Sequence, residues 1–75
     1  MKERIYTAIL ETKYDRSFTN FLINNGIEFE AYDMGGVIAY ECFIKTDKEG
    51  SLIERECESY GAEVVKDKKK KTMIF

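Results

Sequence analysis

An α+β fold, with two helices on one face of a single antiparallel-dominated sheet, is predicted by three features of the sequence. Short runs rich in β-branched and aromatic residues alternate with two stretches whose apolar residues recur at helical spacing. Each helical stretch ends at a glycine, and a Gly-Gly pair separates two consecutive apolar runs. The resulting order is strand, helix, strand, strand, helix, strand (βαββαβ), with room for an extra C-terminal strand. Two βα units joined by a hairpin form a split βαβ arrangement.

The first strand and the first helix are predicted within residues 5–26. Residues 5–10, I-Y-T-A-I-L, are typical of a buried strand. A helix is expected next because the apolar residues share one face, and Asp15 or Ser17 is available to cap its N-terminus. The sequence Asn24-Asn25-Gly26 is expected to end this helix. Its inward positions are Phe18, Phe21, Leu22 and Asn25.

Two strands joined by Gly35-Gly36 are predicted over residues 27–34 and 37–45. The glycines supply the positive φ angles of a two-residue type I′ turn, whereas a phosphate-binding loop would place them between a strand and a helix. A shift of one residue would mix acidic and apolar side chains on both faces, so the register is well specified. The pairs expected on the first face are Ile27 with Ile44, Phe29 with Cys42, Ala31 with Tyr40, and Asp33 with Ile38.

The second helix is predicted between Thr46 and Gly61. Thr46 and Glu49 match the capping-box pattern, in which each side chain accepts a hydrogen bond from an otherwise unpaired amide. Residues 62–66 begin the last strand, and residues 66–75 either extend it or turn back as a short hairpin. The inward residues of the helix are Leu52, Ile53, Cys57 and Tyr60. Its outward residues are Glu54, Arg55, Glu58 and Ser59.

This order of elements resembles the ferredoxin-like fold. The resemblance implies that both helices cover the same face and that the first and third strands are central. Residues 5–10 and 37–45 are the most apolar strands, as central strands require. Acylphosphatases share this fold pattern, but Lys13 and Arg16 follow the first strand here without the glycine-rich cradle of those enzymes. The resemblance to them therefore concerns the fold alone.

The composition excludes several classes of protein. The 75 residues suit one domain, residues 1–75, and a content of 44% hydrophobic and 35% charged residues is typical of a folded chain. The net charge of −2 provides no general attraction to nucleic acid or to anionic membranes. No apolar run approaches the ~20 residues of a membrane span, and the N-terminal segment lacks the pattern of a signal peptide. We expect a cytoplasmic protein.

The chemistry-bearing residues do not predict a catalytic or metal site. The chain has no histidine, and its two cysteines, Cys42 and Cys57, fall on predicted inward faces. Two such ligands are too few for a structural zinc site, which takes four. We therefore expect no metal, no cofactor and no enzymatic activity.

The second face of the sheet is the predicted binding surface, because both helices are expected on the first face. Its pairs are Glu28 with Phe43, Glu30 with Glu41, Tyr32 with Ala39, and Met34 with Val37. The first strand adds either Tyr6, Ala8 and Leu10 or Ile5, Thr7 and Ile9, and residues 72–75 are available to cover the face. We expect a protein partner, or a second copy of this chain in a homodimer, to contact Tyr32, Met34, Val37, Phe43, Glu30 and Glu41.

Three functions are compatible with the sequence. The favoured one is an adaptor or inhibitor of a larger host or phage protein, acting by protein–protein contact. The second is a regulatory module that senses a small-molecule ligand. Domains of the ACT type share the element order and bind amino acids between paired copies, near the end of the first strand. Residues 11–16 and 24–26 would line such a site. The third is an RNA-recognition-like domain in which Tyr6 and Tyr40 or Phe43 stack on bases. Acidic residues on the same face argue against a nucleic acid.

Overall fold

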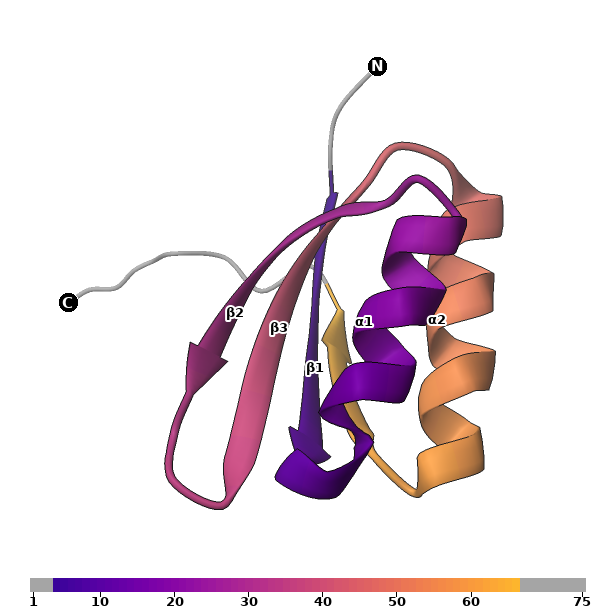
Figure 1. The fold of residues 1–75 in the computed structure, drawn as a ribbon. Helices are drawn as coiled ribbons and strands as arrows, with labels where there is room; N and C mark the ends of the chain where they lie inside the picture. Colours follow the sequence, from indigo (N-terminus) through magenta and orange to yellow (C-terminus); the bar gives the residue numbers. More distant parts are fainter. Residues whose placement is uncertain (1–3, 67–75) are drawn as a thin grey trace, which may run out of the picture.

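A computed structural model describes residues 4–66 as a four-stranded sheet with both helices on one face (Figure 1). The elements in chain order are β1 (Arg4–Glu11), the short 3-10 helix η1 (Thr12–Tyr14), α1 (Asp15–Asn24), β2 (Glu28–Asp33), β3 (Val37–Ile44), α2 (Asp47–Tyr60) and β4 (Glu63–Lys66). The predicted α+β fold and its element order are confirmed. The predicted extra strand or hairpin at the C-terminus lies outside the described residues.

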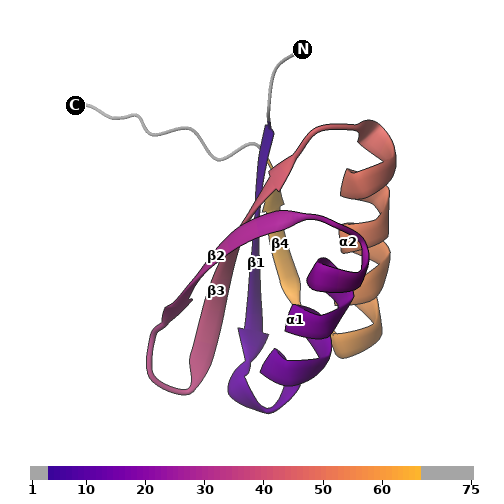
Figure 2. The ribbon, with the colours of Figure 1, turned by 45° about the horizontal axis from the view of Figure 1, so that its top comes forward.

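The strands lie in the order β2-β3-β1-β4, and every neighbouring pair is antiparallel. The first and third strands are therefore central, as the resemblance to the ferredoxin-like fold implied. Figure 2 shows this order across the sheet, with α1 and α2 on the same side. The edges of the sheet are β2 and the shorter β4.

The hydrophobic core lies between the sheet and the helices. From β1 it receives Tyr6, Ala8 and Leu10, which decides between the two orientations that the sequence left open for this strand. The ring of Phe18 on α1 meets Tyr40 on β3 edge to face, with ring centroids 4.9 Å apart. The most deeply buried large side chains are Tyr40, Phe18, Leu10, Leu22, Ile44, Ile53, Cys42 and Cys57.

The hairpin between β2 and β3 has the predicted register. Phe29 pairs with Cys42 and Ala31 with Tyr40, and the amide of Met34 donates to the carbonyl of Val37 at 2.9 Å. Gly35 and Gly36 have φ values of 77° and 91°. Both lie in the region that a type I′ turn requires and that side chains with a Cβ disfavour. The glycine pair is a turn, as predicted.

The start of α1 differs from the prediction. Neither Asp15 nor Ser17 caps the helix, because the chain leaves β1 through η1 and the cap position falls on Tyr14, which makes no side-chain capping bond. The ring of Tyr14 is instead stacked on Tyr60 of α2, with centroids 4.8 Å apart. Asp15 is the first residue of the helix, where a carboxylate interacts favourably with the helix dipole.

The other helix ends follow the predicted pattern. Thr46 Oγ1 accepts a hydrogen bond from the amide of Glu49 at 3.2 Å. The return bond to the Glu49 carboxylate comes from the amide of Lys45 at 2.9 Å, one residue earlier than in the usual capping box. Gly26 and Gly61, with φ values of 68° and 67°, follow the two helices.

Gly50 on α2 is a core position that the sequence did not indicate. It is buried, and a Cβ added there would lie 2.9 Å from the ring and hydroxyl of Tyr6. The missing side chain therefore allows α2 to lie closely over β1. None of the helices in the described part of the chain is long and apolar enough to cross a membrane.

Candidate functional site

The face of the sheet opposite the helices, here called the open face, carries alternate residues of all four strands. Its members are Ile5, Thr7, Ile9 and Glu11 from β1, Glu28, Glu30 and Tyr32 from β2 with Met34 beyond it, Val37, Ala39, Glu41 and Phe43 from β3, and Glu63 and Val65 from β4. All six residues predicted to bind a protein lie on this face. In Figure 1 both helices lie on the other side of the sheet.

Direct cross-strand pairing arranges the open face in rows. The central row runs Glu30, Glu41, Thr7, Val65. One neighbouring row is Glu28, Phe43, Ile5, and the other is Tyr32, Ala39, Ile9, Glu63. The row at the hairpin end is Met34, Val37, Glu11. Acidic side chains thus lie in the middle of the face, between rows that carry large apolar groups.

Glu30 and Glu41 form the like-charge pair that the sequence predicted. Among residues 4–66, no lysine or arginine nitrogen lies within 4 Å of either carboxylate. The hydroxyl of Tyr32 donates to Glu30 Oε1 at 2.6 Å. This hydrogen bond raises the pKa of Tyr32 to about 12, with further contributions from desolvation, from the negative charges of Glu30 and Glu41 and from a weaker hydrogen bond to Glu41. Tyr32 therefore stays a neutral donor that lies against both carboxylates of the pair, with its shorter contact to Glu30.

Thr7 is the polar residue of the central row that the predicted site did not include. It is 5% exposed, and its buried Oγ1 has no hydrogen-bond partner in the part of the chain that the structure describes. Its direct neighbours in the row are Glu41 and Val65. An unpaired buried hydroxyl costs free energy, so the position is unfavourable for the isolated protein. In the sequence, Thr7 is noticeable only as a single threonine within the apolar run of residues 5–10. The sequence did not show which face of the sheet it would join, because the orientation of β1 was undecided.

Apolar exposure on the open face increases toward β2 and the hairpin. Tyr32 is 46% exposed and Met34 61%, whereas Ala39 in the third strand is buried. Ile5, Ile9, Val37 and Phe43 are half-buried. The only other large apolar side chain exposed to this degree in the described part is Ile23 on α1, away from the open face.

Cys42 and Cys57 lie in the core as free thiols, as predicted. Burial raises the pKa of each to about 12, with smaller contributions from Cys57 at Cys42 and from Glu56 at Cys57. Such thiols stay protonated at neutral pH and are poor nucleophiles. The described residues contain no group of three or more histidine, cysteine or carboxylate side chains arranged to hold a metal ion.

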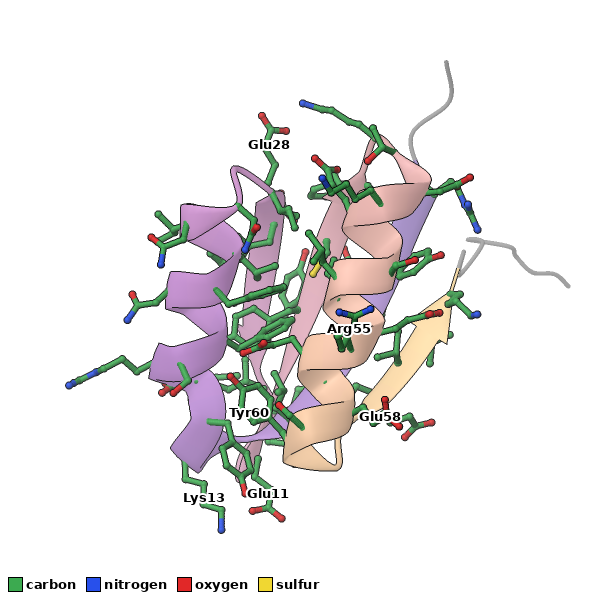
Figure 3. All side chains as sticks on the ribbon, turned by 90° about the vertical axis from the view of Figure 1, so that its right-hand side faces the viewer. Glu11, Lys13, Glu28, Arg55, Glu58 and Tyr60 are labelled. Carbon is green, nitrogen blue, oxygen red and sulfur yellow. The ribbon has the colours of Figure 1, made fainter. Side chains whose placement is uncertain are left out.

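The residues proposed for a small-molecule site do not come together within the chain. Residues 11–16 lie before and at the start of α1, and residues 24–26 lie at its other end. Figure 3 shows the separation, with Glu11 and Lys13 at one end of the molecule and Glu28, just after the second segment, at the other. The ten residues of α1 span about 15 Å.

The aromatic residues considered for RNA stacking are also divided. Tyr6 and Tyr40 are buried on the helix side of the sheet, and Phe43 is the one of the three that lies on the open face. A base-stacking platform needs aromatic groups side by side on an accessible surface. The arrangement does not provide one from these residues.

Comparison with known proteins finds no match to this chain among family models, curated proteins or solved structures.

Proposed function

We propose that this protein is a small binding protein that acts by protein–protein contact through the open face, without catalysing a reaction. The observation that supports the proposal is the placement of both helices on one face, which leaves apolar and aromatic groups of the other face exposed. Exposed patches of this kind usually mark interaction surfaces. Its role is that of an adaptor or inhibitor of a larger host or phage protein.

The open face has the two components of a protein interface. Tyr32 and Met34 are large, exposed side chains of types enriched in interface cores. Glu30 and Glu41 supply a charged group that gives orientation and selectivity. A partner that covers the face would bury Tyr32 and Met34 and compensate the negative charge of Glu30 and Glu41.

Two charged substitutions and one matched control test the proposal. Met34→Lys and Phe43→Lys place a cation on the open face, while Ile23→Lys makes the same change at a helix position that is as exposed as Met34, at 61%. Each variant of the 75-residue chain is immobilised and incubated with a native extract, and the proteins that it captures are identified by mass spectrometry. Light scattering measures the mass of each purified variant. We expect a partner retained by wild type and Ile23→Lys to be lost from both open-face variants.

A partner that remains bound to Met34→Lys and Phe43→Lys, with both variants folded, would contradict the proposal. If Phe43→Lys unfolds the chain, Phe43 belongs to the core and the assignment of the surface is wrong. The RNA-binding alternative receives no support from the open face, because its carboxylates repel phosphate. The two segments of the sensor alternative lie apart within one copy, so such a site would have to form between paired copies.

A further inference from the structure

We infer that the partner presents a lysine or arginine side chain flanked by apolar residues, and that its cationic group binds between Glu30 and Glu41. This inference rests on the proposed function and specifies the chemistry of the partner. It is carried by the charge of the open face, by the geometry of the carboxylate pair and by the unpaired hydroxyl of Thr7.

The strand positions of the open face carry carboxylates and no cation. The acidic residues are Glu11, Glu28, Glu30, Glu41 and Glu63. Glu11 has a cation nearby, Lys13, at 3.6 Å. The two carboxylates of the central row have none within the described residues. A surface of one sign selects a partner of the opposite sign.

The pair geometry suits one organic cation. Residues directly opposite each other in an antiparallel pair have Cβ atoms about 4.5–5.5 Å apart, so both carboxylates reach a single ammonium or guanidinium group. Tyr32 occupies one oxygen of Glu30 and leaves acceptor positions on both side chains. A lysine ammonium brings three donors, and an arginine brings five in a planar arrangement.

Thr7 supplies a further acceptor beside the pair. Its hydroxyl has no partner within residues 4–66 and lies in the same row, directly next to Glu41. Because Oγ1 is covered in the free protein, it reaches a ligand only after rotation about the Cα–Cβ bond or movement of the Glu41 side chain. A bound cation gives this hydroxyl the partner that the described residues do not provide.

The rows on either side predict the neighbours of the cation. Phe43 and Ile5 lie in one adjacent row, and Tyr32 with Ile9 lies in the other. Rows are two residues apart along each strand, about 6.5–7 Å. An extended partner segment aligned with β3 therefore places residues i−2, i and i+2 over these three rows. The expected pattern is apolar, any residue, Lys or Arg, any residue, apolar.

A second copy of this chain is a poorer occupant. In a two-fold dimer each face meets an identical face, so the carboxylates of one copy would approach those of the other. Like charges brought together at an interface cost several kcal/mol. Residues 68–71 are four lysines followed by T-M-I-F, so this chain contains a cationic segment with apolar residues on one side. The test must separate it from a foreign partner.

The test selects peptides from a random-sequence display library on the immobilised full-length protein. Wild type should enrich peptides with the apolar-x-Lys/Arg-x-apolar pattern. A selected peptide should bind Glu41→Gln about tenfold more weakly than wild type, while Glu58→Gln on the outer side of α2 should bind it as wild type does. Thr7→Val should also weaken binding, and NMR shift changes should centre on Thr7, Glu30 and Glu41.

The outcomes separate this inference from the proposed function. Enriched peptides without lysine or arginine that still lose binding on Phe43→Lys would overturn the inference and leave the open face as the binding surface. Peptides that bind Phe43→Lys as well as wild type would overturn both. If replacing the lysines of residues 68–71 by serine shifts the NMR signals of Glu30 and Glu41 in the free protein, the chain's own segment is the occupant and the foreign partner is excluded.

Discussion

Thr7 and Thr19 have the same side chain in opposite hydrogen-bonding situations. Thr7 Oγ1 is buried on the open face and has no hydrogen-bond partner among residues 4–66. Thr19 Oγ1 lies 3.0 Å from the hydroxyl of Tyr40, which itself donates to the carbonyl of Asp15 at 3.1 Å. A buried group without a partner lowers stability, and a satisfied one contributes to it. The two threonines should therefore respond differently to loss of the hydroxyl.

The same substitution should therefore have opposite effects at these two positions. Thr7→Val removes an unpaired hydroxyl and should raise the free energy of unfolding by about 1 kcal/mol, because valine has nearly the same shape and strand preference. Thr19→Val breaks a hydrogen bond and should lower it by about 1 kcal/mol. Urea unfolding measures both. A loss of stability in Thr7→Val would show that its hydroxyl has a partner in solution.

The hydroxyl of Tyr32 reports on the carboxylate pair. Its pKa is raised to about 12, first by the hydrogen bond to Glu30. Glu30→Gln removes that acceptor charge, so the pKa of Tyr32 should move down toward its ordinary value of 10.0. NMR titration of the tyrosine Cζ signals follows each ring separately. A Tyr32 that titrates near pH 10 in the wild-type protein would contradict the contact.

At the scale of elements, the predictable parts were those with a local physical signal. The helix stops at Gly26 and Gly61, the capping residue Thr46 and the Gly35-Gly36 turn each depend on a few adjacent residues. The start of α1 was mispredicted because Tyr14 is placed by stacking on Tyr60, a contact between distant parts of the chain.

The orientation of β1 could not be predicted, because its two sets of alternating residues are nearly equally apolar. Pairing with β3 decides it, since Tyr6 lies opposite Cys42 on the core side and Thr7 opposite Glu41 on the open face. The placement of the six predicted residues on one face was predictable because the hairpin register follows from the turn. Thr7 was missed because its position depends on the other strand pair.

The turn itself provides the test at this scale. Gly36 has φ 91°, and a valine there should lower the free energy of unfolding by more than about 1 kcal/mol, since a β-branched residue is strained at positive φ. Gly36→Asn is the matched control, because asparagine tolerates positive φ better, and it should cost less. Thermal unfolding measures both. Equal stability of Gly36→Val and wild type would exclude the type I′ turn.

At the scale of the whole molecule, folding keeps two thiols and one tyrosine hydroxyl protonated to a higher pH than in the unfolded chain. Burial raises the pKa of Cys42 and of Cys57 from the ordinary 9.0 to about 12, and that of Tyr60 from 10.0 to about 12. The unfolded chain thus releases these protons at a lower pH than the folded chain. Their contribution to stability is complete below pH 9 and is lost as the pH rises toward 12.

The free energy of unfolding should therefore fall above pH 9. Each thiol should contribute a slope of about 1.4 kcal/mol per pH unit once the unfolded chain has ionised. Urea unfolding at a series of pH values measures the slope. Cys57→Ala is the control, because it should roughly halve the slope between pH 9 and 10 whatever its effect on stability at pH 7. A stability that is constant from pH 8 to 10.5 would contradict the burial of these thiols.

The central claim is that the open face is the binding surface of the protein. It is tested most directly by placing the photo-cross-linking residue p-benzoylphenylalanine at Tyr32, and in a matched protein at Ile23, which is exposed on α1. After irradiation in a native extract, mass spectrometry identifies what each position contacts. We predict a cross-link from position 32 to a foreign protein and none from position 23. Cross-links from position 32 only to residues of its own chain, or a partner captured only from position 23, would contradict the claim.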